Sequence, residues 1–288
     1  MSKQNEKMMA NLQRLLETQD FKSPEELKKF MDTIMGQELP SFPKEALNFK
    51  EQAQDLVFEA YELDHAKGRV KIEMALQLDA DCIEAYEYLA EQEQTAEIAT
   101  AFYEKGISIG RRLWGGKYVE ETKGSFWGFH ETRPFMRCLQ QYSECLYSMG
   151  KVHECIAVME ELIELNTNDN QGVRDQLMLY LIETNEDKKF VKYAKQFEND
   201  GMTFSLFNRA LFAFKTEGET EASNKKLKTA LKQNKFVAAK LLSQKPILEI
   251  PSIHGIGDED EANYYVSFAQ PIWQDVKGAL AWLKKNNN

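Results

Sequence analysis

The feature that most constrains this chain is the spacing of its apolar residues, which recur at intervals of three and four over long stretches. Segments 46–63, 135–149 and 152–165 each show it. This is the period of a helix with one apolar face. Alternating, β-branched runs of strand length are nearly absent, and only seven prolines and fifteen glycines punctuate the 288 residues. The sequence therefore predicts an all-α fold.

Three places share one local layout, in which an apolar pair is followed by a polar helix end and then by a new helix: 75–89, 162–177 and 230–242. Gly150 lies between two helical patterns and Gly218 ends another, consistent with a period of about 34 residues. Glycine permits a tight turn between helices, and a small residue such as Cys155 lets them approach closely. This layout resembles the tetratricopeptide repeat (TPR), although Ala80, Thr167 and Lys235 stand where that repeat has proline.

Residues 166–174, NTNDNQGVR, lie at one of these junctions. Asn, Asp and Thr favour caps and turns because their side chains bond free backbone groups. A calcium loop needs glycine at its sixth position and glutamate at its twelfth. Counted from Asn166, Gly172 is seventh and Leu177 is twelfth. We therefore predict a turn between repeats at this junction.

The expected organisation has five parts. They are an N-terminal helical segment and hinge (1–45), TPR-like hairpins (46–110), an aromatic and glycine-rich insertion (111–135), further TPR-like hairpins (136–245) and C-terminal capping helices (246–288). Ser23 and Pro24 are start signals for a helix in the first part. The insertion either packs against the hairpins or lines a binding surface, and packing is favoured. The fold class expected is thus a right-handed solenoid with non-repeat helices at both ends.

Composition excludes some classes of partner. The formal net charge is −10, which argues against nucleic acid and anionic membrane surfaces as partners. The four cysteines form no CxxC pair, and the N-terminus lacks the apolar core of a secretory signal. No segment approaches the roughly 18 apolar residues of a membrane span. These features predict a cytoplasmic protein, and they give no prediction of its oligomeric state.

A more specific resemblance rests on four separated segments that occur in the same order. They are 79–110 (DADCIEAYEYLAEQEQTAEIATAFYEKGISIG), 126–139 (FWGFHETRPFMRCL), 165–174 (LNTNDNQGVR) and 257–265 (GDEDEANYY). Together they resemble a bacterial family of TPR-like proteins related to the suppressor of tumorigenicity 7 protein family. The likeness spans about residues 46–283. It implies a TPR-like scaffold, and the membrane association of the eukaryotic members does not carry over.

No motif for catalysis or for a cofactor is present in the sequence. His130–Pro134 (HETRP) lacks the second histidine of a zinc hydrolase motif, and the nucleophile elbow and phosphate-binding glycine loops are missing. The acidic run 257–262 (GDEDEA) fits a helix cap in which Asp258 and Glu261 form a capping box, more readily than a metal site. Lysines between 225 and 245 fit a solvated helix face or a surface for an acidic partner. We expect no metal and no cofactor.

The most informative polar set is Arg133, Arg137, Gln140, Gln171 and Arg174. In the repeat register set by Gly150, Arg137 and Gln140 are positions 2 and 5, and Gln171 and Arg174 are the same positions of the next repeat. In TPR proteins these positions line the concave groove. An arginine fork matches the two oxygens of a carboxylate or phosphate. Apolar contacts are expected from Tyr147, Trp127 and Phe129.

An alternative for the arginines is structural. Arg133 and Arg137 would then pair with Glu131 or Glu144 and hold the repeats together.

These observations predict a non-enzymatic scaffold that binds a peptide or protein segment in its groove, through a carboxylate or another acidic group of the partner. A second hypothesis is a regulatory sensor that responds to a peptide. A third is an enzyme whose site lies under the insertion and uses His130, Glu131 and Arg133. A deep pocket around these three residues favours the enzyme, and an open groove favours the scaffold.

Overall fold

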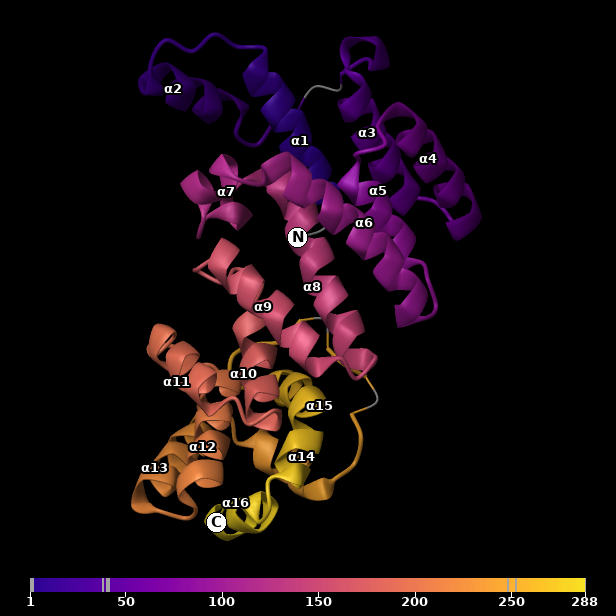
Figure 1. Cartoon of the computed structure of the whole chain (residues 1–288). Coiled ribbons are helices and arrows are strands. Elements are labelled where there is room, and N and C mark those ends of the chain that lie inside the picture. Colours follow the sequence, from indigo (N-terminus) through magenta and orange to yellow (C-terminus); the bar gives the residue numbers. More distant parts are fainter. Residues whose placement is uncertain (1–2, 38, 40–41, 248, 252, 288) are drawn as a thin grey trace. The chain divides into compact units, whose positions relative to one another are not determined.

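The computed structural model describes residues 3–37, 39, 42–247, 249–251 and 253–287. These residues form sixteen α-helices and three short 3₁₀-helices, with no β-strand among them (Figure 1). The predicted all-α class is confirmed. The chain divides into two compact units: Met1–Lys151 with Glu164–Thr167, and Val152–Ile163 with Asn168–Asn288.

Helical hairpins build the first unit. Helix α3 (Phe49–Tyr61) packs against α4 (His65–Leu78), and α5 (Ile83–Glu91) packs against α6 (Ala96–Trp114). Helix α8 (Arg133–Ser148) then packs against both α6 and α5. Each hairpin helix buries the apolar face that its period predicts. The core of the first hairpins includes Ala53, Leu56, Val57, Ala60, Ile72, Ala75, Ala85 and Tyr88.

The polar caps of these helices come from their own sequence. The Asn48 side chain accepts a bond from the Glu51 N–H and Glu51 accepts one from the Asn48 N–H, which makes a reciprocal capping box on α3. Asp64 caps α4 and Thr95 caps α6, each by accepting a single bond from a backbone N–H of the first turn. These caps fix where the hairpin helices begin.

Two further helices precede the hairpins: α1 (Lys3–Glu17) and α2 (Pro24–Ile34). The Ser23 side chain accepts a bond from the Glu26 N–H, and Pro24 lies in the first turn, so the predicted helix start is confirmed. Helix α2 has no buried residue within its span. Of the hinge predicted at 36–45, residues 38, 40 and 41 lie outside the described residues.

The aromatic insertion forms α7 (Lys117–Thr122) and the 3₁₀-helices η2 (Phe126–Gly128) and η3 (His130–Thr132). Phe126 is fully buried, and its ring contacts those of Phe135 and Tyr118. The insertion thus packs into the first unit, as favoured from the sequence.

The second unit contains two hairpins, α10 (Val173–Glu183) with α11 (Asp187–Gln196) and α12 (Thr203–Glu217) with α13 (Glu221–Gln233). Its remaining helices are α14 (Phe236–Ser243), α15 (Glu259–Asp275) and α16 (Ala279–Asn286). Helix α15 packs against α14, α10 and α12. Helix α9 (Val152–Leu165) contributes residues to both units.

The predicted turns are present. Gly150 and Gly218 have φ angles of 75° and 73°, in the left-handed region that favours glycine, and each lies between two helices. In the junction 166–174, Asp169 accepts bonds from the N–H groups of Val173 (2.8 Å) and Arg174 (3.0 Å). The junction is therefore a turn that starts α10, as expected.

The acidic run before α15 is a cap, with one difference from the expectation. Asp258 accepts a bond from the Glu261 N–H at 2.7 Å, as an N-cap does. The Glu261 carboxylate, however, accepts bonds from the N–H groups of Gly257 (2.6 Å) and Thr203 (3.2 Å). Glu261 is buried, so it links α15 to the start of α12 instead of completing a capping box.

Candidate functional site

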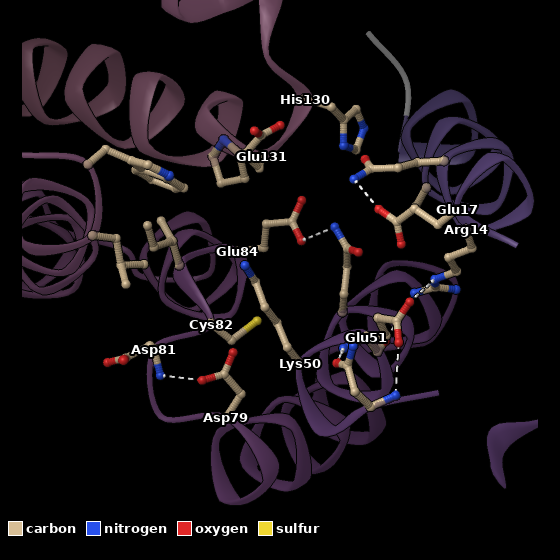
Figure 2. A pocket seen from close by; sticks show the side chains of 18 residues that line it. Arg14, Glu17, Lys50, Glu51, Asp79, Asp81, Cys82, Glu84, His130 and Glu131 are labelled. Carbon is tan, nitrogen blue, oxygen red and sulfur yellow. Dashed lines mark hydrogen bonds and ion pairs between the residues drawn. The ribbon is translucent and has the colours of Figure 1, made fainter. Parts of the chain in front are cut away.

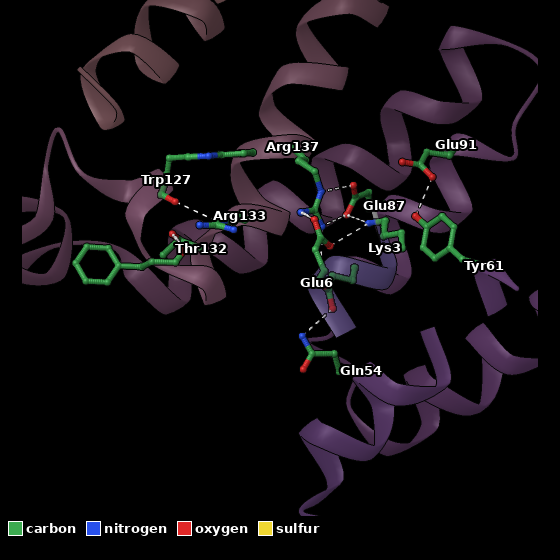
Figure 3. A network of polar contacts seen from close by, with 12 residues as sticks. Lys3, Glu6, Gln54, Tyr61, Glu87, Glu91, Trp127, Thr132, Arg133 and Arg137 are labelled. Carbon is green, nitrogen blue, oxygen red and sulfur yellow. Dashed lines mark hydrogen bonds and ion pairs between the residues drawn. The ribbon is translucent and has the colours of Figure 1, made fainter. Parts of the chain in front are cut away.

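Helix α1 lies against one face of the first unit, and the contact is mainly between charged side chains (Figure 3). We define the α1-contact face as the residues of α3, its C-terminal end, α5 and α8 whose side chains contact α1. They are Glu51, Asp55, Tyr61, Glu62, Glu87 and Arg137.

The contacting residues of α1 follow helical spacing. Lys3, Lys7 and Arg14 occupy one side of the helix together with Glu6 and Ala10. Glu6, Ala10 and Arg14 are the buried residues of α1. This side of α1 is therefore charged where a docked helix usually presents apolar side chains.

Arg137 lies at the centre of the face. Its Nε and Nη2 atoms donate to the two carboxylate oxygens of Glu87, at 2.6 and 2.7 Å, and its Nη1 donates to Glu6 Oε1 at 2.7 Å (Figure 3). Burial alone would raise the pKa of Glu87, but the charges of Arg137 and Lys3 outweigh it and hold that pKa below its usual value. Glu87 is thus a fixed anion that orients Arg137 toward α1.

Arg137 has more carboxylates around it than its single positive charge can neutralise. Burial raises the pKa of Glu84, which accepts a bond from Gln54 at 3.2 Å. Burial and the charge of Glu87 also raise the pKa of Glu91, whose carboxylate accepts a bond from Tyr61 Oη at 2.8 Å. The surroundings of Arg137 are therefore acidic even with α1 in place.

The other end of α1 is held by Arg14. Its Nη1 contacts Asp55 Oδ1 at 2.9 Å, and its Nε lies 3.4 Å from Glu51 Oε1. Lys3 Nζ contacts Glu87 at 3.3 Å, and Lys7 Nζ contacts Glu62 at 3.4 Å. Most ion pairs of this contact thus join a cation of α1 to a carboxylate of the α1-contact face.

A cavity of about 250 Å³ adjoins the C-terminal half of α1 (Figure 2). The starts of α3, α5 and α8 open onto it, and both signs of charge line it. Its lining includes the acidic and basic residues Arg14, Glu17, Lys50, Glu51, Asp79, Asp81, Glu84 and Glu131, together with His130. The walls come from five separated parts of the sequence, so no local motif indicates this cavity.

His130 has an unusual position on the cavity wall. Its Nε2 atom is buried and makes no hydrogen bond within the described residues. Burial, reinforced by the charge of Arg133, lowers the pKa of the imidazole, so the ring is neutral at neutral pH. His130 and Glu131 both line the cavity, whereas Arg133 is not among its lining residues.

The arginines expected to anchor a ligand already have partners. Arg137 contacts Glu6, Glu84 and Glu87 on other helices, so the expected pairing with Glu131 or Glu144 is wrong for this residue. Arg133 Nε donates to the Trp127 carbonyl at 3.0 Å, and its guanidinium lies over the Trp127 ring.

Arg174 is held by carboxylates of its own unit. Its Nη1 contacts Asp169 at 2.9 Å, its Nε contacts Asp200 at 2.7 Å, and its guanidinium lies over the Phe197 ring. Arg137 and Gln140 belong to the first unit, and Gln171 and Arg174 to the second. Neither unit alone therefore contains the full set that was expected to converge.

The expected apolar contacts are distributed within the first unit. Trp127 is half-buried in η2, Phe129 is exposed and touches the Tyr118 ring, and Tyr147 is half-buried on α8. Trp127 stacks with Arg133 rather than with Arg137. The sequence did not reveal that Lys3, Glu6 and Arg14 belong to the site.

Neither a metal-binding cluster nor a membrane-spanning helix is found among the described residues. Within the described ranges, no group of three or more His, Cys, Asp or Glu residues has the arrangement of a metal site. None of the helices in the same ranges combines the length and apolar character that a bilayer crossing requires.

No family model matches the chain, and no match was found among curated proteins or solved structures.

Proposed function

We propose that this protein is a non-enzymatic scaffold that binds a helical segment of another protein on the α1-contact face of its first unit. In this proposal the helical hairpins are TPR-like repeats, and α3, α5 and α8 are the helices that line the groove.

One observation carries the proposal: the face already holds a helix. The contact with α1 is made through a half-buried arginine, Arg137, which Glu87 orients and which donates a hydrogen bond to Glu6. A surface built to hold one helix by such contacts is suited to a second helix of the same chemistry.

The test is capture of a partner followed by cross-linking. The tagged full chain is incubated with native lysate, and the cross-linked residues are mapped by mass spectrometry. We expect a partner that cross-links to α3, α5 or α8. Asp55→Lys, on the face, should abolish its recovery, whereas Glu73→Lys, an exposed change of the same charge on α4, should not. A partner recovered equally by both variants would contradict the proposal.

A second candidate function rests on the cavity. The neutral imidazole of His130 can act as a base toward a small ligand, with the Glu131 side chain on the same cavity wall. A ligand found by thermal shift with the wild type and lost with His130→Phe would favour this function. Unchanged binding by that variant would exclude His130 from the ligand site.

A further inference from the structure

The α1-contact face is acidic. Four of its six residues are Glu51, Asp55, Glu62 and Glu87; the first three pair with cations of α1, and Glu87 pairs with Arg137 and with Lys3 of α1. Glu84 and Glu91 lie next to the same network. When α1 leaves, these carboxylates lose Lys3, Lys7 and Arg14 and retain Arg137 as the cation in their midst.

The fit of α1 to this face is imperfect. Glu6 is buried, yet its Oε2 atom accepts no hydrogen bond within the described residues, and Lys3 Nζ lies 3.7 Å away from it. Ala10 is the buried apolar residue of α1, while Met8 and Met9 are exposed. Burying charges costs desolvation that pairing only partly repays, so such a contact adds little net stability.

The linkage of α1 to the hairpins also permits release. Helix α2 buries no residue, so the described part of the chain between α1 and α3 has no α-helix anchored in the core. Release of α1 therefore breaks its ion pairs without removing an apolar core from the first unit.

We propose that the α1-contact face is a docking surface for a basic helix of a partner protein, and that α1 is the internal occupant which this helix displaces. The partner helix carries cations at the spacing of Lys3, Lys7 and Arg14, a small residue at the place of Ala10, and one carboxylate for Arg137. This inference rests on the proposed function and specifies the partner. It reverses the charge expected from the sequence, which was an acidic partner.

The experiment uses a fluorescent peptide of residues 3–20 as the probe and the full chain as the receptor. In the receptor Lys7→Glu/Arg14→Glu, α1 is repelled from an unchanged face. We expect the peptide to bind this receptor at least tenfold more tightly than it binds the wild type, by fluorescence anisotropy. The matched receptor Lys28→Glu/Lys29→Glu has the same net charge, but its changes lie on exposed positions of α2. It should behave as the wild type does.

Three controls define the site and the state of α1. A peptide in which Lys3, Lys7 and Arg14 are replaced by glutamate should not bind the receptor. Hydrogen exchange should show that residues 3–17 lose protection in Lys7→Glu/Arg14→Glu, while α5 and α6 keep theirs. A receptor that also carries Asp55→Lys should lose the gain in peptide affinity.

Three results would overturn the inference: α1 still protected in the charge-reversed receptor, no gain in peptide affinity once α1 is released, or equal binding of the acidic peptide. Failure of the proposed function is separate, because no partner is present in this assay. If the peptide binds but no partner is captured, the α1-contact face would serve to hold α1 within the chain and the proposed function would fail. Capture of a partner with α1 still protected would retain the scaffold and reject the displacement.

Discussion

At the scale of single residues, Arg137 connects three helices. It projects from α8, binds Glu87 on α5 with both arms of its fork, and reaches Glu6 on α1. Removing one member of a buried ionic network leaves the others charged and unpaired, and this is more costly than the pair itself is stabilising.

Arg137→Ala should therefore lower the free energy of unfolding by about 3–5 kcal/mol, measured by urea denaturation at neutral pH. Arg69→Ala is the matched control, because Arg69 is exposed on α4 and its contact with Glu73 is 3.9 Å long. That control should stay within about 0.5 kcal/mol of the wild type. A loss of less than about 1 kcal/mol for Arg137→Ala would show that these ionic contacts do not stabilise one another.

Asp175 provides a test by pH. Burial, assisted by the charges of Asp200, Asp169 and Glu261, raises its pKa to about 7, although Arg174 opposes the rise. Between about pH 4 and 7 the folded protein keeps a proton that the unfolded chain has lost, so this group lowers stability progressively as the pH rises. Asp175→Asn removes that effect.

We expect Asp175→Asn to be more stable than the wild type at pH 8, and its advantage to grow by about 1–2 kcal/mol between pH 5.5 and pH 8. Denaturant unfolding at the two pH values measures this. Asp275→Asn, an exposed change in the same unit, is the matched control for the loss of one carboxyl group. An advantage for Asp175→Asn that shrinks as the pH rises would contradict the assignment.

The sequence identified Arg137 and Arg174 as unusual but not their partners. Glu6 is 131 positions from Arg137, and Asp200 is 26 from Arg174. A charged residue on a helix has many candidate partners in the sequence. Helical periodicity indicates the direction of its side chain, but it does not identify the distant helix that this side chain contacts. The expected local partners, Glu131 and Glu144, reflect this limit.

At the scale of elements, α6 and α8 pack closely because two glycines of α6 face α8. A Cβ atom on Gly110 would lie 2.2 Å from the Phe135 ring, and one on Gly106 would lie 3.0 Å from Cys138 Sγ. Phe135 is buried against Phe126 and Trp114, so its ring has little room to move.

Gly110→Ala should lower the free energy of unfolding by about 1–3 kcal/mol, because overpacking exceeds the gain in helix propensity. Gly128→Ala, in the same unit, meets no atom within 4 Å and should stay close to the wild type. Thermal and urea unfolding of both variants are the measurements. A stabilised Gly110→Ala would mean that α6 and α8 separate easily.

Helix α1 should respond to salt more than its neighbours do. Raising the salt from 0.05 to 0.5 M shortens the screening length to a few ångströms and weakens its ion pairs. Hydrogen exchange of residues 3–17 should accelerate several-fold, while exchange in α5 and α6 stays unchanged. Equal acceleration in all three helices would indicate unfolding of the whole unit instead.

The positions of the helices and turns were the part of the fold that the sequence predicted best. Apolar spacing located the helices, Ser23 with Pro24 marked the start of α2, and Gly150 and Gly218 marked turns. The docking of α1 was not readable, because its buried side carries Glu6 and Arg14 where the pattern leads one to expect leucine. Glu261 was predicted to belong to the α15 cap, but its bond with the Thr203 N–H, 58 positions away, was not predicted.

At the scale of the whole molecule, the chain forms two units, and no feature of the sequence marks where they divide. The expected second block of hairpins, 136–245, runs across the division at residues 151 and 152. Apolar periodicity continues through α8 and α9, so a boundary inside a run of helices leaves no change in composition.

The path of the chain near α9 has a practical consequence. The first unit recovers Glu164–Thr167 after the chain has entered the second, and Asn166 pairs there with Ser125 while the Thr167 N–H bonds the Gly124 carbonyl. A cut after Lys151 would take these residues away from the insertion, and a cut after Thr167 would take most of α9 away from the second unit. Because each unit includes a short segment that lies among residues of the other in the sequence, a gene divided at either point would encode one complete unit and one incomplete unit.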